Sequence, residues 1–132
     1  SGRANPEFLY ALAAANGVAT LESLTASFRL DWPDRRFSSR SEFRSEFVAY
    51  AGASTCLAND LIALAPGPES RYAAFDVDFE PLLRTYIDVM AEGTKAVRTR
   101  NVSEYRDFHR HLDESLRAPT EVASSVRGRR GN

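Results

Sequence analysis

The chain has 132 residues, of which 43% are hydrophobic and 27% are charged, and its net charge is −1. This length and composition are typical of one ordinary globular domain and exclude an intrinsically disordered chain. The near-zero net charge predicts no general attraction to nucleic acid or to anionic lipid, and no apolar run approaches the roughly 18 residues of a membrane span, so we expect no membrane partner.

Two short helices are predicted near the start of the chain, after a flexible N-terminal arm over residues 1–7. Residues 6–17 begin with a proline and end with a glycine, which are typical of the first turn and the stop of a helix. Residues 20–28 follow, and their apolar positions repeat at i, i+3 and i+7: Leu21, Leu24 and Phe28. These two segments predict a helical hairpin.

A third helix is predicted from the sequence SRSE at residues 39–42, which matches a capping box. Phe43, Phe47 and Tyr50 give this helix an apolar face. Gly52 is expected to end or interrupt it, and a further helical stripe then continues to residue 64.

The segment near residues 71–79 alternates well enough for one short extended segment. Pro81 is expected to open the next helix, and Gly93 to interrupt it. A last helix is predicted over residues 104–116, with Ser103 as its cap and Pro119 as its stop. The whole pattern predicts an all-α, single-domain bundle of five or six helices over residues 8–118, followed by a flexible basic tail over residues 119–132.

Cys56 is the only cysteine, so no internal disulfide is expected. It lies among small and apolar residues, which predicts a buried and inert thiol. A single cysteine and the lack of a visible leader favour a reduced intracellular compartment. No pattern indicates a cofactor.

Arginine dominates the cations, because sixteen of the seventeen basic residues are Arg. Arg suits protein and RNA interfaces, since its planar guanidinium can donate two hydrogen bonds to one carboxylate or phosphate. We therefore predict a non-enzymatic helical interaction module, self-associating as a homodimer or higher oligomer, whose Arg-rich surface contacts an acidic partner or RNA. The residues expected on that surface are Arg35, Arg36, Arg40, Arg44, Arg127, Arg129 and Arg130.

The two histidines, His109 and His111, lie two residues apart on the last predicted helix. Such residues diverge by roughly 200° around a helix, so they cannot bind one metal ion together. We expect both to lie at the border of the helix and to pair with nearby acids, and we expect no metal site.

Arg106 and His111 are separated by four residues, which resembles the Rx4–6H motif of the HEPN ribonucleases, a family of small helical proteins. The resemblance implies that His111 acts as acid or base toward a ribose hydroxyl while Arg106 holds the phosphate. It is limited to these two residues, and Asp107 stands where the family tends to have Asn. A HEPN-like ribonuclease is the alternative to the interaction module.

The sequence SRYAAFDVDFE at residues 70–80 is similar to a signature in coat proteins of flexuous plant viruses. Arg71 and Asp76 are the matching residues. The resemblance implies a helical, RNA-binding, coat-like protein, which is a further alternative.

Overall fold

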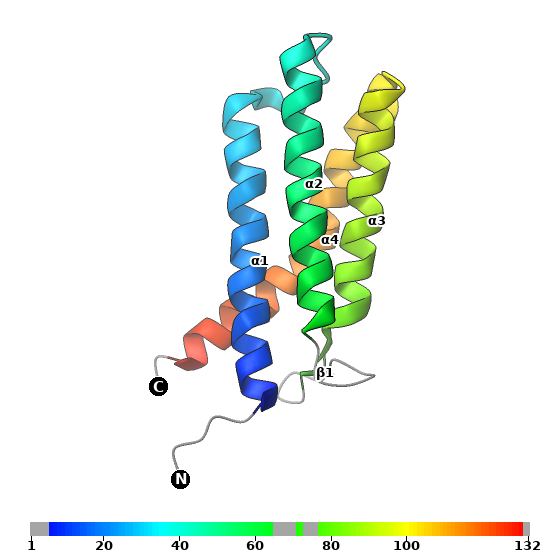
Figure 1. The fold of residues 1–132 in the computed structure, drawn as a ribbon. Helices are drawn as coiled ribbons and strands as arrows, with labels where there is room; N and C mark the ends of the chain where they lie inside the picture. The colour runs from blue at the N-terminus through cyan, green and yellow to red at the C-terminus, as the bar shows by residue number, and fades with distance from the viewer. Residues whose placement is uncertain (1–5, 65–70, 73–76, 131–132) are drawn as a thin grey trace.

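The computed structural model describes the backbone of residues 6–64, 71–72 and 77–130, and the side chains of residues 9–64 and 79–124. Within these residues the fold is all-α and contains four long helices packed side by side (Figure 1). The helices are α1 (Pro6–Asp31), α2 (Ser41–Ala63), α3 (Phe79–Arg98) and α4 (Val102–Arg130). The predicted all-α fold class is confirmed, but the prediction of five or six helices is not confirmed.

The predicted N-terminal hairpin is one continuous helix, α1. Helix α1 continues through Gly17, and the glycine has a role in packing. A Cβ at Gly17 would lie 2.5 Å from Cδ1 of Leu61 in α2. Gly17 therefore lets α1 and α2 approach closely. Sequence alone cannot distinguish such a glycine from a helix stop.

A short 3-10 turn, η1 (Pro33–Arg35), connects α1 to α2. Asp34 and Arg35 both have positive φ angles, 71° and 54°, so the chain reverses here through left-handed backbone without glycine. The predicted capping box does not form: residue 40 occupies the cap position of α2 without a side-chain cap hydrogen bond. The helix then runs through Gly52 without a break.

Before α3, the structure describes two-residue strands β1 (Arg71–Tyr72) and β2 (Val77–Asp78), which pair antiparallel. The single extended segment expected over residues 71–79 is not confirmed, and residues 73–76 lie outside the described residues. Helix α3 begins at Phe79 and continues through Gly93. A Cβ at Gly93 would lie 2.6 Å from the Phe108 ring, so this glycine also serves close helix packing.

A tight turn joins α3 to α4. Arg100 has a φ of 54°, and the backbone N–H of Asn101 donates to the carbonyl of Ala96 at 2.9 Å, which is the pattern of a left-handed helix stop. The Asn101 Oδ1 atom then accepts the backbone N–H of Glu104 at 3.0 Å. Asn101, not the expected Ser103, therefore caps α4.

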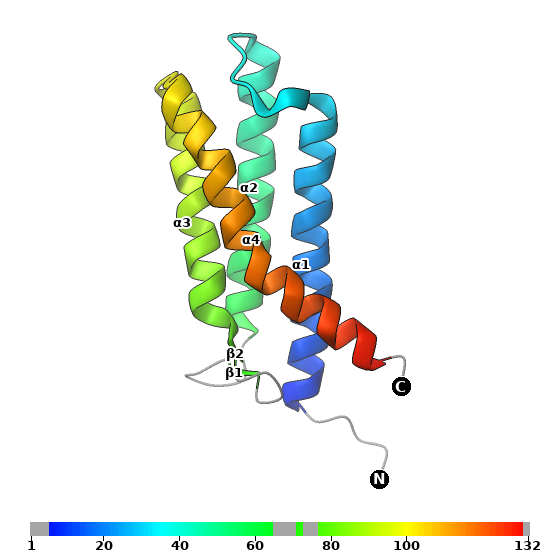
Figure 2. The same ribbon diagram turned by 180° about the vertical axis from the view of Figure 1, so that it is seen from behind.

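Helix α4 continues through Pro119, contrary to expectation, and crosses α1 at an angle, in front of α1 in the view of Figure 2. Proline has no N–H to donate to the carbonyl four residues earlier, and its ring crowds that carbonyl. A helix tolerates this only with local distortion. The proposed domain limits at residues 8 and 118 remain a prediction, although the α4 backbone runs beyond the second limit to Arg130.

The buried apolar residues form two clusters among the described residues, and aromatic rings are prominent in the larger one. Phe47 of α2 contacts Phe28 of α1 and both Tyr105 and Phe108 of α4, with ring centroids 5.4–5.6 Å apart. Phe28 and Phe47 belong to apolar stripes that the sequence predicts, and all four rings are buried. Among the described residues, no helix combines the length and apolar character that a membrane crossing requires.

Candidate functional site

Arg29 of α1 organises a polar network between α1 and α4. Its Nη2 atom donates to Nδ1 of His109 at 3.2 Å, and its Nη1 atom lies 3.0 Å from Oδ1 of Asp113. Arg35 of η1 contacts the other carboxylate oxygen of Asp113 at 2.6 Å. Three segments distant in sequence are thereby joined through charged groups.

His109 is buried inside this network and is only 4% exposed, so the expected position at a solvated border is wrong. Burial lowers the pKa of His109 to about 4, and the positive charge of Arg29 adds to this effect. The imidazole is therefore neutral at pH 7. Because Nδ1 accepts a hydrogen bond, the proton is on Nε2, and this atom is buried without a hydrogen-bond partner among the described residues.

Asp113 carries the negative charge of the network. Burial would raise its pKa, but the charges and hydrogen bonds of Arg29 and Arg35 outweigh burial and lower the pKa below its usual value. The carboxylate is therefore ionised at neutral pH. Its side chain is 42% exposed, so each ion pair contributes little to the free energy of unfolding.

Hydroxyl groups continue the polar interior beside Arg29. Thr25 and Tyr50 share a hydrogen bond of 2.7 Å. Burial raises the pKa of Tyr86, and the nearby Ser54 hydroxyl lowers it by a smaller amount. Neither of these two hydroxyls makes a hydrogen bond of ordinary geometry. Burial also raises the pKa of Tyr50, so these groups stay neutral and position the helices.

A crevice of about 630 Å³ opens next to this network, between α1 and α4. Two of its lining side chains carry buried atoms without hydrogen-bond partners among the described residues, namely Oε1 of Glu22 and Nε of Arg29. The lining residues are Glu22, Thr25, Ala26, Arg29, Asp113, Leu116, Arg117, Thr120 and Glu121.

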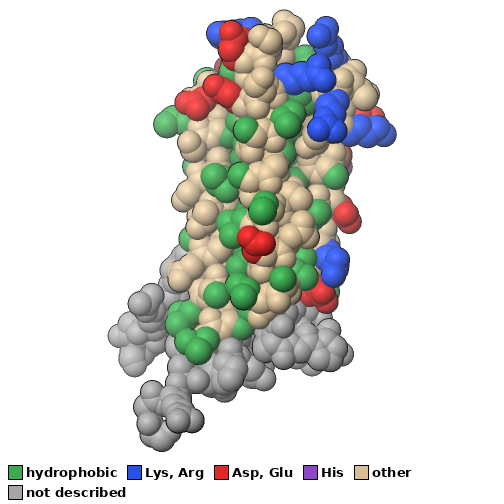
Figure 3. Space-filling model, in the orientation of Figure 1, with side chains coloured by type: hydrophobic (Ala, Val, Ile, Leu, Met, Phe, Trp, Pro, Cys, Tyr) green, Lys and Arg blue, Asp and Glu red, His purple; other side chains and the backbone are tan. Residues whose placement is uncertain are grey.

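A second hollow, of about 700 Å³, lies on the opposite side of the molecule between α2 and α3. Most of its lining is apolar or small, and a Cβ added at Gly52 would meet no atom within 4 Å. Figure 3 shows this face, on which small and apolar side chains follow the helices. The lining residues are Val48, Ala51, Gly52, Thr55, Cys56, Asn59, Ile87, Ala91, Thr94, Lys95, Arg98 and Thr99.

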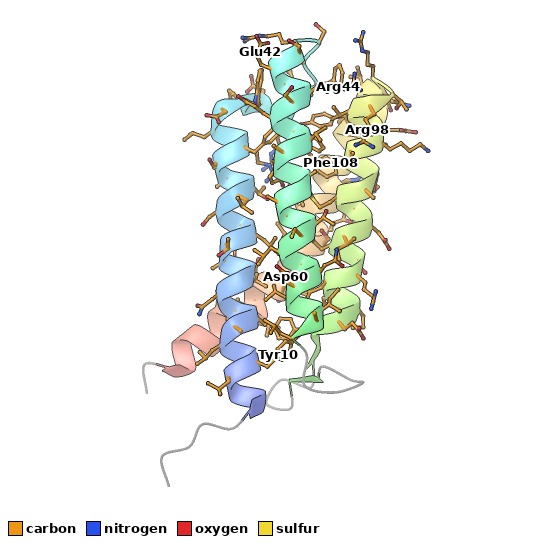
Figure 4. The ribbon with its side chains drawn as sticks, viewed as in Figure 1. Tyr10, Glu42, Arg44, Asp60, Arg98 and Phe108 are labelled. Atoms are coloured by element: carbon orange, nitrogen blue, oxygen red, sulfur yellow. The ribbon has the colours of Figure 1, made fainter. Side chains whose placement is uncertain are left out.

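The α2–α3 face is basic at one end. Arg44 lies in the first turn of α2 and Arg98 ends α3, and the two residues line a common hollow of about 480 Å³ (Figure 4). Lys95 lies one turn before Arg98. Asp60 and Asp88 are exposed further along the same two helices, away from this basic end (Figure 4 labels Asp60).

The arginines predicted to form one interaction surface have separate roles in the structure. Arg35 is engaged with Asp113, whereas the Arg40 guanidinium lies 5.4 Å from the ring centre of Trp32. Arg36 and Arg44 are exposed, and only Arg44 belongs to the α2–α3 face. The side chains of three more lie outside the described residues: Arg127, Arg129 and Arg130.

The residues of the ribonuclease alternative are not brought together within one copy. Arg106 is exposed, and His111 Nδ1 donates to Oε1 of Glu92 in α3 at 2.8 Å. Five residues along a helix correspond to a rotation of about 140°, so Arg106 and His111 lie at opposite borders of α4. The pairing of His111 with an acid follows the expectation, although the acid comes from another helix.

The coat-like alternative depends on Arg71 and Asp76. The side chain of Arg71 and the whole of Asp76 lie outside the described residues.

Neither family models, nor curated proteins, nor solved structures give a match to this chain.

Sequence reasoning missed the α2–α3 face for an identifiable reason. Cys56 is exposed and not buried as expected, and Gly52 lies within α2 instead of ending it. The small residues around Cys56 suggested a core segment, but small residues also occur where a helix is left open to a partner. Among the described residues, no three His, Cys, Asp or Glu side chains come together as metal ligands would.

Proposed function

We propose that this protein is a non-enzymatic helical interaction module that self-associates through the α2–α3 face. Gly52 is the observation that carries the proposal. A glycine inside a helix lowers stability by about 1 kcal/mol relative to alanine. A Cβ added at Gly52 would have no atom within 4 Å apart from its chain neighbours and the nearby backbone of α2. Unlike Gly17 and Gly93, it serves no contact within one copy. The close approach of a helix from a second copy would use it.

The distribution of charge supports a second copy as the partner. Arg44 and Asp60 each lie eight residues from Gly52, on opposite sides of it in sequence. An antiparallel, two-fold pairing centred near Gly52 would therefore place Arg44 of one copy at the same level along the helix axes as Asp60 of the other, on opposite borders of the paired faces. Arg98 and Asp88 of α3 have the same order along the face. The predicted acidic partner is then the second copy itself.

The two alternatives have less support. A ribonuclease would need Arg106 and His111 to act together, and these residues lie at opposite borders of α4. A coat-like protein would need assembly and RNA contacts through Arg71 and Asp76. None of the described contacts favours either alternative over self-association.

Solution mass tests the proposal. We expect a dimer for the wild type in sedimentation equilibrium. Replacement of Gly52 with Gln should raise the dissociation constant at least tenfold, because a long side chain would separate the two faces while a better helix former keeps the monomer folded.

Glu114→Gln is the matched control. Glu114 is exposed on α4, which lies behind α2 in Figure 1, so the new glutamine is remote from the proposed interface. The control should remain dimeric. A wild-type monomer at all concentrations up to the millimolar range, or a dimer unaffected by Gly52→Gln, would contradict self-association through this face.

A further inference from the structure

The crevice between α1 and α4 has a charge pattern that points to a ligand, independently of self-association. The α1 residues that line it lie at i, i+3, i+4 and i+7, so one helix face is turned toward α4: Glu22, Thr25, Ala26 and Arg29. Packed helices normally bury apolar faces against each other. Here both facing surfaces carry charges, and a hollow of about 630 Å³ separates them.

One end of the crevice is acidic. Helices α1 and α4 run antiparallel and are held in register by the Arg29–Asp113 pair. Glu22 lies seven residues before Arg29 and Glu121 lies eight residues after Asp113, so both carboxylates are displaced about 10 Å toward the same end. Neither forms an ion pair with another described residue, and Oε1 of Glu22 is buried without a hydrogen-bond partner among them. A buried, unpaired carboxylate oxygen is unfavourable unless a donor reaches it.

The remainder of the crevice is basic and partly apolar. Arg29 Nε is a buried donor without an acceptor among the described residues. Arg117 of α4 is exposed, lines the crevice and forms no ion pair with a described residue. Ala26 and Leu116 provide apolar surface between the charged groups.

We propose that this crevice binds a small zwitterion in which a short alkyl chain separates an ammonium group from a carboxylate. The ammonium group donates to Glu22 and Glu121, the carboxylate accepts from Arg29 and Arg117, and the alkyl chain lies against Ala26 and Leu116. The ligand would reach atoms that lack partners among the described residues, namely Oε1 of Glu22 and Nε of Arg29. A ligand with only one charged end would leave the other set unsatisfied and would bind more weakly.

Pro119 contributes to the shape of the crevice. It lies within α4 between the crevice residues Arg117 and Thr120. A proline inside a helix bends it away from an ideal path. We expect a bend at this point to widen the space between α1 and α4 where the ligand would bind.

Calorimetric titration with 6-aminohexanoate tests the proposal, with hexanoate and hexylamine as analogues that each keep one charged end. We expect saturable binding of 6-aminohexanoate and at least tenfold weaker binding of either analogue at the same ionic strength. Glu22→Gln and Arg117→Gln should each weaken 6-aminohexanoate binding at least tenfold.

Arg106→Gln is the control, because Arg106 is exposed on α4 but does not line the crevice, and it should leave binding unchanged. Circular dichroism verifies folding, and the exposed position of Arg117 makes its variant suitable even if Glu22→Gln proves unstable. The proposal is overturned if 6-aminohexanoate shows no saturable binding at millimolar concentration. Equal binding of one analogue, or undiminished binding to folded Arg117→Gln, overturns it as well.

Discussion

At the scale of single residues, His109 shows how position in the fold changes the chemistry of a side chain. His109 and His111 are two residues apart, yet one is buried beside Arg29 and the other shares a partly exposed pair with Glu92. Burial and a neighbouring positive charge remove His109 from the physiological range of titration. It contributes to structure as a neutral acceptor.

This environment predicts a specific dependence of stability on pH. The pKa of His109 falls from 6.5 to about 4 on folding, so between these values the unfolded chain binds the proton more readily. The free energy of unfolding should therefore decrease as the pH falls from 6.5 to 4, by roughly 3 kcal/mol in total. Above pH 6.5 the contribution is complete.

Urea unfolding at pH 7, 5.5 and 4.2 measures this dependence. His109→Gln keeps an acceptor for Arg29 but cannot titrate, so its unfolding free energy should vary much less over the same interval. Asp113 does not interfere with this comparison. Because its pKa is lowered in the folded protein, its contribution to the free energy of unfolding declines only below about pH 4. An equally steep pH dependence in His109→Gln would show that another group is responsible.

At the scale of elements, three glycines lie inside helices for different reasons. Gly17 and Gly93 stand where neighbouring helices touch, whereas Gly52 faces open space. All three look alike as interruptions of a helical pattern, and each was expected to end or interrupt a helix. Contacts with Leu61 and Phe108 explain two of them. No contact within one copy explains the third, and the proposed self-association would give it a role.

Alanine substitution should separate these roles. Gly93→Ala forces a methyl group against the fully buried Phe108 ring and should lower the free energy of unfolding by about 1–3 kcal/mol. Gly52→Ala meets no atom and should raise it by up to about 1 kcal/mol in the monomer. Chemical unfolding at a protein concentration below the dimer dissociation constant measures both. Destabilisation of the monomer by Gly52→Ala would indicate an internal role for this glycine.

At the scale of the whole molecule, the two hollows lie on different sides of the bundle. The α2–α3 face is broad and largely apolar, with opposite charges at its two ends, and is suited to a second copy. The α1–α4 crevice is smaller and combines charged groups with apolar surface, and is suited to a small molecule. The aromatic core between them holds all four helices in place.

The proposed antiparallel dimer predicts which introduced cysteines can form a disulfide between two copies. Ser45 and Asn59 are exposed and each lie seven residues, two helical turns, from Gly52. In a Cys56→Ser background, a mixture of Ser45→Cys and Asn59→Cys proteins should oxidise mainly to the mixed disulfide dimer. Non-reducing electrophoresis with mass spectrometry identifies the products. Predominant Ser45→Cys homodimers would instead indicate parallel helices, while leaving self-association intact.

The sequence by itself determined the fold class and much of the core. Residues such as Phe43, Phe47, Tyr105 and Phe108 repeat with helical spacing, and the structure buries all four. Local periodicity is sufficient here because an apolar stripe must find a buried face wherever its helix packs.

Only the tertiary structure decided the number of helices and the position of the sites. Glycine and proline have the same local preferences whether they end a helix or lie within one, and contacts made by residues distant in sequence select between these outcomes at Gly17 and Gly93. The same reason applies to the crevice, since Glu22 and Glu121 become neighbours only after α4 folds back along α1. Their proximity results from tertiary packing, which local sequence patterns do not predict.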